Sequence, residues 1–156
     1  MKRDILKTET TFSAMELEFK YKSIPHIGPL PKVDCSQVAY NYLRPIFDPF
    51  VESYECFYAV YLNRANKIVG HAKIAQGTAT ACAVDPCFII LHALKLNARG
   101  IIIAHNHPSG GLIPSQQDIK LTKQVKEAAK LYGIDLFDHL IMTYNTYYSF
   151  ADESML

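Results

Sequence analysis

The sequence carries almost no excess charge of either sign. Its 156 residues contain 16 lysines and arginines against 15 aspartates and glutamates, for a formal net charge of +1 at pH 7. This balance excludes a protein that binds nucleic acid through bulk positive charge, although it leaves room for a local basic patch. Cysteines are also few and include no C-x-x-C pair, which excludes a disulfide framework. We expect all of them to be buried thiols: Cys35, Cys56, Cys82 and Cys87.

Long hydrophobic runs are missing too. No apolar stretch approaches the roughly 20 residues that span a bilayer. Charged residues interrupt the N-terminus, where a secretory signal needs about 7–15 apolar residues in a row. We therefore expect a soluble, cytoplasmic protein with no membrane contact. The chain is 49% hydrophobic and 20% charged, which is typical of a globular protein, and its length predicts one domain or one domain with an arm.

Residues 1–32 are interpreted as an N-terminal arm. Apolar and charged residues alternate from Met15 to Lys22, which predicts a half-buried strand. Three prolines and a glycine between Ser23 and Pro31 then indicate an extended linker. We expect the strand to pair with the main sheet or with a neighbouring subunit, which makes the arm a route to a homo-oligomer.

Residues 33–156 form the predicted domain, in which strands and helices alternate. A first helix is expected to begin at Asp34 or Ser36 and to end at Arg44-Pro45. Strands are expected at 55–63, 68–75, 101–104, 135–143 and 147–150, with further helices opening at Asp85-Pro86 and Pro114-Ser115. The segment 101–104 is apolar without alternation, which predicts a strand buried on both faces. This order predicts an α/β domain with a mixed sheet and helices on both faces.

The most informative residues follow that buried strand. His105 and His107 are separated by one residue, so both side chains point to the same side of the strand. Two imidazoles aimed at one point are half of a zinc site, and Asp118, in the first turn of the next helix, supplies a third ligand. Two histidines and a carboxylate, with a fourth position left to water, are typical of catalytic zinc. Ser115 and Asp118 also match a helix N-terminal cap, and the two interpretations are compatible.

A His-x-His pair alone is more often structural, but the joint pattern H-x-H-x7-S-x2-D is far more specific. It is the signature of the JAMM (JAB/MPN-type) metalloprotease family. The surrounding sequence resembles the RadC branch of that family, in A-H-N-H-P-S-G, in P-S-x-x-D, in the segment from Leu136 to Ile141 and in Tyr148-Ser149-Phe150. The resemblance runs from about Val33 to the C-terminus. It implies a three-layer α/β/α JAMM fold, of the cytidine-deaminase-like kind, with a mixed sheet.

The family also uses a glutamate on its first core strand. Glu52 and Glu55 are the candidates, and Glu55 is preferred because it begins a strand pattern that resembles RadC. The two histidines and Asp118 would then hold one Zn²⁺ per chain, which brings the pKa of bound water toward about 7. Glu55 would be the general base, and the Ser115 hydroxyl would donate to the oxyanion. The expected reaction is hydrolysis of a peptide or isopeptide amide in an unidentified peptide or protein conjugate.

Three neighbouring residues have weaker assignments. Asp138 and His139 match the RadC pattern, and either they orient a metal-binding imidazole or they form a hydrogen-bonded structural pair. Asn106 is interpreted as a turn residue only.

Lysines line the longest predicted helix, which is expected to end at Gly133. They are Lys120, Lys123, Lys126 and Lys130, opposite an expected apolar row of Leu121, Val125, Ala128 and Tyr132. A solvated helix face explains these lysines, and a stripe that contacts phosphates is the alternative. That alternative leads to a second function, a RadC-like accessory protein of DNA repair that binds DNA or a repair partner. RadC proteins usually carry an N-terminal helix-hairpin-helix segment, for which residues 1–32 are too short and too rich in proline.

Overall fold

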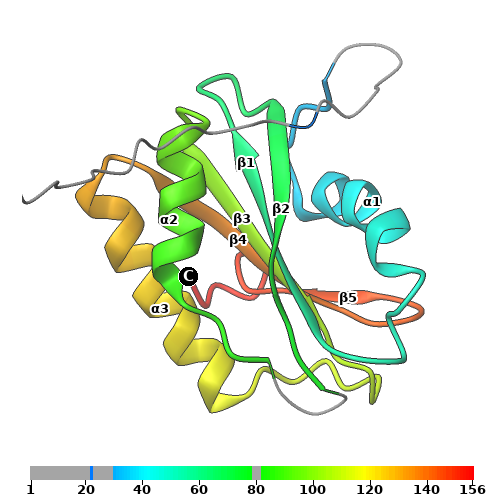
Figure 1. The fold of residues 1–156 in the computed structure, drawn as a ribbon. Coiled ribbons are helices and arrows are strands. Elements are labelled where there is room, and N and C mark those ends of the chain that lie inside the picture. Colours follow the sequence, from blue (N-terminus) through cyan, green and yellow to red (C-terminus); the bar gives the residue numbers. More distant parts are fainter. Residues whose placement is uncertain (1–21, 23–29, 79–81) are drawn as a thin grey trace, which may run out of the picture.

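A computed structural model of the chain describes Lys22, residues 30–78 and residues 82–156. These residues form an α/β domain of three layers (Figure 1). The predicted arm strand at 15–22 lies outside the described residues except for Lys22, so it stays a prediction. In chain order the elements are α1 (Ser36–Phe47), β1 (Cys56–Leu62), β2 (Ile68–Gln76), α2 (Pro86–Lys95), β3 (Gly100–Asn106), α3 (Gln116–Leu131), β4 (Asp135–Met142) and β5 (Tyr147–Ser149).

The five strands form one mixed sheet in the order β2-β1-β3-β4-β5. β1 pairs antiparallel with both β2 and β3, whereas β3 and β4 run parallel because α3 carries the chain back between them. In the register of β1 and β3, Phe57 lies opposite His105. The beginning of β1 therefore lies beside the histidine-bearing end of β3.

Helices cover both faces of the sheet, as predicted (Figure 1). α1 buries Leu43 and Phe47 against one face, and α2 and α3 bury Ile89 and Val125 against the other. Every residue of the two central strands β1 and β3 is buried. The predicted strand at 101–104 is thus confirmed, and it continues to Asn106. Among the described residues, no helix is long and apolar enough to cross a membrane.

The predicted end of α1 at Arg44-Pro45 is wrong. The helix runs through Pro45 to Phe47. A proline inside a helix removes one backbone hydrogen bond, a cost of about 3 kcal/mol. Here the extra turn buries Phe47 completely, in ring contact with Phe50 and Tyr58. Burial of a phenylalanine offsets most of that cost, since it is worth roughly 1.5–3 kcal/mol.

Two predictions of burial are also wrong. Tyr132 is exposed at the end of α3, because the apolar row of that helix ends at Ala129. The core-facing row of α3 includes the polar residues Asp118 and Thr122. Only two of the four cysteines, Cys56 and Cys82, are buried, while those at positions 35 and 87 are exposed.

Candidate metal centre

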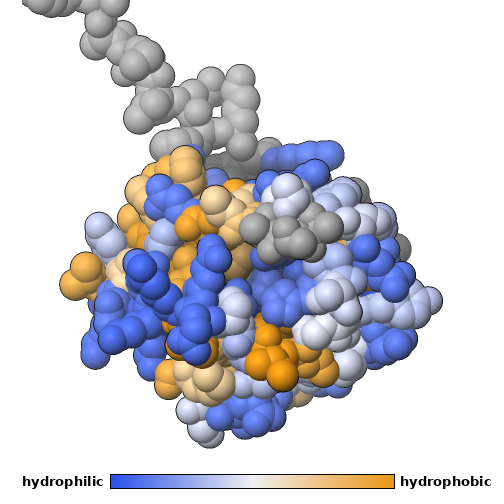
Figure 2. Space-filling view, turned by 90° about the horizontal axis from the view of Figure 1, so that it is seen from below, coloured by the Kyte–Doolittle hydropathy of each residue, from blue (hydrophilic) through white to orange (hydrophobic). Residues whose placement is uncertain are grey.

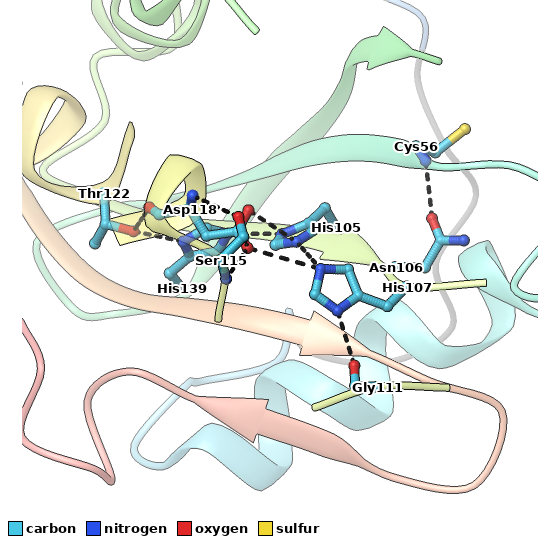
Figure 3. Close-up of polar contacts among 9 residues, drawn as sticks. All are labelled: Cys56, His105, Asn106, His107, Gly111, Ser115, Asp118, Thr122 and His139. Atoms are coloured by element: carbon cyan, nitrogen blue, oxygen red, sulfur yellow. Dashed lines mark hydrogen bonds and ion pairs between the residues drawn. The ribbon is translucent and has the colours of Figure 1, made fainter. Parts of the chain in front are cut away.

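Strand β3 and helix α3 bring the three predicted ligands together (Figure 3). His105 is fully buried in β3, His107 follows the strand, and Asp118 lies in the first turn of α3. The Nε2 atoms of the two histidines are 2.9 Å apart. Asp118 places Oδ1 3.2 Å from Nε2 of His105 and Oδ2 3.7 Å from Nε2 of His107. Ligand atoms of all three residues lie within 4.8 Å of one another, close enough to hold a single metal ion.

The predicted ligand Asp118 is also part of the N-terminal cap of α3. Ser115 is the N-cap of α3, and its Oγ accepts a hydrogen bond of 3.1 Å from the backbone N–H of Asp118. In return, Oδ2 of Asp118 accepts from both the N–H and the Oγ–H of Ser115, each at 2.7 Å. This reciprocal capping box occupies Oδ2. Oδ1, which lies closer to His105, is left available to a metal.

A tight loop orients His107. Its Nδ1 lies 2.8 Å from the carbonyl oxygen of Gly111. A carbonyl only accepts, so Nδ1 carries a hydrogen, and Nε2 is the ring nitrogen that faces Asp118. The chain turns back through Gly110, whose φ of 78° is a left-handed conformation that glycine adopts without strain. Gly110 thus allows the turn that brings the carbonyl of Gly111 to the His107 imidazole.

The electrostatics of the three residues favour a cation. Burial lowers the pKa of His105 to about 4, although the charge of Asp118 opposes this shift. The hydrogen bond to Asp118 raises the pKa of His107 against the effect of burial. Burial raises the pKa of Asp118, but bonds from His107 and Ser115 and the charge of His105 outweigh it, so the net shift is downward. Two imidazole nitrogens and one ionised oxygen form a donor set that fits a divalent ion such as zinc.

Glu55 lies at the same site, immediately before β1. Its backbone N–H donates to the carbonyl of Thr78, at 2.9 Å, which holds the start of β1 in place. Together with His107, Ser115 and Asp118, its side chain lines a cavity of about 290 Å³. Burial raises the pKa of Glu55, while His107 lowers it and Asp118 raises it. Glu52, the other candidate, is exposed.

Apolar residues form much of the remaining cavity wall, among them Phe57, Val84 and Leu121. Figure 2 shows the molecule from the end at which β3 stops and α3 begins, and hydrophilic and hydrophobic surfaces lie side by side there. A polar cluster beside an apolar wall is a common arrangement in small-molecule and peptide sites.

Asn106 has a role that the sequence did not reveal. The residue is fully buried, and its Oδ1 accepts from the N–H of Cys56 at 2.8 Å. Its Nδ2 donates to the carbonyls of Val51 and Tyr54, at 2.9 and 2.8 Å. These bonds fasten the segment that carries Glu55 to β3, so the interpretation as a turn residue is wrong. Strand alternation contained the signal, because a residue between two histidines that face one way must face the other.

Asp138 and His139 have separate partners. Oδ1 of Asp138 accepts from the N–H groups of His139 and Ala151, at 2.7 and 3.0 Å, and Oδ2 accepts from Ser149 Oγ at 2.7 Å. Burial raises the pKa of Asp138 against these bonds. Asp138 therefore holds the turn after β5. His139, in contrast, reaches a predicted ligand, since its Nε2 lies 2.9 Å from Nδ1 of His105.

The four lysines of α3 are all exposed and lie away from the cavity wall. Lys123 forms an ion pair of 3.9 Å with Glu127 in the next turn. Exposed pairs of this kind contribute about 0.3–0.5 kcal/mol.

Known proteins resemble this chain over most of its length. The family model of the RadC-like JAB domain matches residues 33–155. A UPF0758 protein of Flavobacterium johnsoniae is 34% identical over 149 residues, which are 96% of this chain and 64% of the relative. A UPF0758 protein of Aquifex aeolicus is 39% identical over 120 residues, 77% of this chain and 51% of the relative. A UPF0758 protein of Streptococcus sanguinis is 42% identical over 100 residues, which are 64% of this chain and 44% of the relative.

The chain spans less than two thirds of the length of each of these relatives. The matched segment nonetheless contains every element from α1 to β5 and all the residues of the metal centre. Its mixed five-stranded sheet and helices are consistent with the JAB/MPN fold. The chain belongs to the RadC-like JAB domain family.

Proposed function

We propose that this chain is a zinc-dependent hydrolase of the JAMM type, which cleaves a peptide or isopeptide amide in a peptide or protein conjugate. The observation that supports the proposal is that His105, His107 and Asp118 bring their ligand atoms within 4.8 Å of one another. Two of these residues, His107 and Asp118, line one cavity together with Glu55. A zinc ion held by the three ligands would supply a Lewis acid that acidifies water and polarises the amide carbonyl.

Glu55 is assigned the proton transfers. Glu55 lines the cavity and is half-buried, and burial raises its pKa. A raised pKa makes a carboxylate a stronger base, which suits a group that must accept a proton. In the proposed reaction Glu55 takes a proton from the attacking water and later gives it to the leaving amine.

Ser115 is assigned the role of hydrogen-bond donor to the oxyanion that forms during the reaction. Its Oγ lies in the cavity wall, with its hydrogen directed at Oδ2 of Asp118. Rotation of the hydroxyl would redirect the hydrogen to a developing oxyanion, an interaction worth about 3 kcal/mol in comparable sites. Because the N–H of Ser115 also binds Oδ2, the carboxylate keeps one of its two donors after the rotation.

The test combines elemental analysis with turnover. Wild-type protein supplied with zinc at neutral pH should hold one zinc per chain, and His107→Ala should lose it. Glu55→Gln should keep the metal, but its hydrolysis of a peptide and isopeptide panel should fall by about a hundredfold or more. Glu52→Gln is the matched control, since Glu52 is exposed, and it should retain both properties. A wild type without zinc would reject the proposal, and full activity of Glu55→Gln would reject the assigned base.

A second function, DNA binding, is supported by one observation, the exposure of all four lysines along α3. If these side chains contact phosphates, affinity for duplex or single-stranded DNA should fall steeply with salt. A Lys126→Gln, Lys130→Gln double variant should weaken binding, whereas Lys73→Gln on β2 should not. No binding by the wild type at low salt would reject this function.

A further inference from the structure

A buried row of hydrogen bonds leads away from the metal centre and ends at Thr122, one helical turn after Asp118 (Figure 3). Thr122 is 3% exposed, and His139 is fully buried. Oγ1 of Thr122 donates to the backbone carbonyl of Asp118 at 2.6 Å and lies 2.7 Å from Nδ1 of His139. Nε2 of His139 lies 2.9 Å from Nδ1 of His105. This Thr122–His139 relay connects α3, β4 and β3.

The position of each hydrogen along the relay follows from the last acceptor, the backbone carbonyl of Asp118. A threonine hydroxyl has one hydrogen, and a carbonyl oxygen only accepts, so that hydrogen is given to Asp118. Oγ1 must then accept from His139, which places the hydrogen of that ring on Nδ1. A neutral imidazole has one N–H, so Nε2 of His139 is an acceptor and Nδ1 of His105 is the donor.

We propose that Thr122 and His139 are positioning residues, which hold His105 in the Nδ1–H tautomer and thereby keep the lone pair of its Nε2 directed at the metal position. The inference deepens the proposed function and rests on it for the identity of the metal. The tautomer itself is a property of the metal-free chain.

The relay matters because His105 has a competing arrangement. Nε2 of His105 and Nε2 of His107 are 2.9 Å apart, which is a hydrogen-bonding distance. If His105 carried its hydrogen on Nε2, it would donate to His107, and the two ligands would satisfy each other. The relay holds the hydrogen on the far side of the ring. The Gly111 carbonyl likewise holds a hydrogen on Nδ1 of His107, so in the neutral ring of each histidine the Nε2 lone pair is available to a cation.

Removal of the Thr122 hydroxyl should release His105. In Thr122→Val, which keeps the shape of the side chain, Nδ1–H of His139 loses its acceptor in a buried site. His139 can then move its hydrogen to Nε2 and donate to His105, which forces the hydrogen of His105 onto its own Nε2. Thr122→Ser keeps the hydroxyl and should behave like the wild type.

The first measurement is the tautomer. Nitrogen-15 NMR of histidine-labelled, metal-free protein distinguishes Nδ1–H from Nε2–H rings, and the signals of His105 are assigned by comparison with His105→Gln. We expect Nδ1–H in the wild type and in Thr122→Ser, and Nε2–H in Thr122→Val. Thr143→Val is the matched control, since it removes an equally buried threonine hydroxyl that binds the backbone of Thr146. This control should keep the wild-type tautomer.

The second measurement is zinc affinity, by competition with a chromophoric chelator. Thr122→Val should bind zinc roughly tenfold to a hundredfold more weakly than Thr143→Val. If Thr122→Val does not fold, His139→Phe takes its place, since it keeps a ring that stacks 4.7 Å from Phe150 but removes the acceptor of His105.

Two outcomes would overturn the relay: an Nε2–H ring at His105 in the wild type, or a Thr122→Val variant that matches Thr143→Val in both measurements. A wild type that shows the Nδ1–H ring but binds no zinc would reject the hydrolase and still support the relay.

Discussion

Replacement of Asn106 tests how the segment that carries Glu55 is held against the sheet. The Asn106 side chain is fully buried and makes three hydrogen bonds of 2.8–2.9 Å, to Cys56, Val51 and Tyr54. Each bond contributes about 0.5–1.5 kcal/mol net. Loss of all three in Asn106→Ala should lower the free energy of unfolding by about 3 kcal/mol. For a chain of this size the melting temperature should fall by roughly 6–12 °C.

Asn106→Asp is the sharper variant because it keeps the shape of the side chain and changes only the donors. One aspartate oxygen still accepts from the N–H of Cys56. The other replaces an amide that donates to the carbonyls of Val51 and Tyr54, so it faces two acceptors without a hydrogen. Asn106→Asp should therefore be less stable than Asn106→Ala at pH 7. The difference should shrink on acidification, because a protonated carboxyl can donate once.

Urea unfolding of the metal-free variants, followed by circular dichroism at pH 7 and pH 5, measures both effects. Asn41→Ala is the control, since Asn41 is exposed on α1 and bonds to another exposed side chain, Gln37. It should change the free energy of unfolding by less than about 0.5 kcal/mol. If Asn106→Asp proves as stable as the wild type, the amide donors do not hold the segment and the reasoning fails.

Two further predictions concern packing and pH. In Gly100→Ala the new Cβ would lie 2.1 Å from Cε2 of Phe137, so the variant should lose about 1–3 kcal/mol. Most of that loss should vanish in a Phe137→Ala background, and additive losses in a double-mutant cycle would contradict the clash. Burial lowers the pKa of His105 to about 4 and that of His139 well below its usual value, so the unfolded chain binds protons at these sites that the folded chain does not. Stability of the metal-free protein should fall from about pH 6.5 toward pH 4, as measured by urea unfolding. His107, whose pKa is raised, adds stability below about pH 6.5 that is lost as the pH rises through its folded pKa, and it offsets only part of the trend. A stability that increases on acidification would contradict these assignments.

The elements that the sequence predicted correctly depend on interactions within a few residues. The apolar segment at 101–104 indicated a buried central strand, and Asp85 and Ser115 are caps that bond to backbone N–H groups two and three residues later. The spacing of His105 and His107 placed both on one side, because alternation is a property of every extended strand. The convergence of both with Asp118 could be predicted because a strand, a loop and a helix start connect the three directly. The role of Glu55 and the identity of the metal stay predictions.

The remaining features depend on segments that are distant in the sequence. Whether α1 continues past Pro45 depends on the packing of Phe47 against the sheet, and that contact cannot be predicted from the residues of the helix alone. Asn106 meets the backbone 50 to 55 residues earlier in the chain. Thr122 reaches His105 only through His139, because parallel pairing of β3 with β4 brings His139 beside the metal centre. Backbone periodicity thus determined which residues face the site, and only the packing of β3, β4 and α3 decided which buried groups orient them.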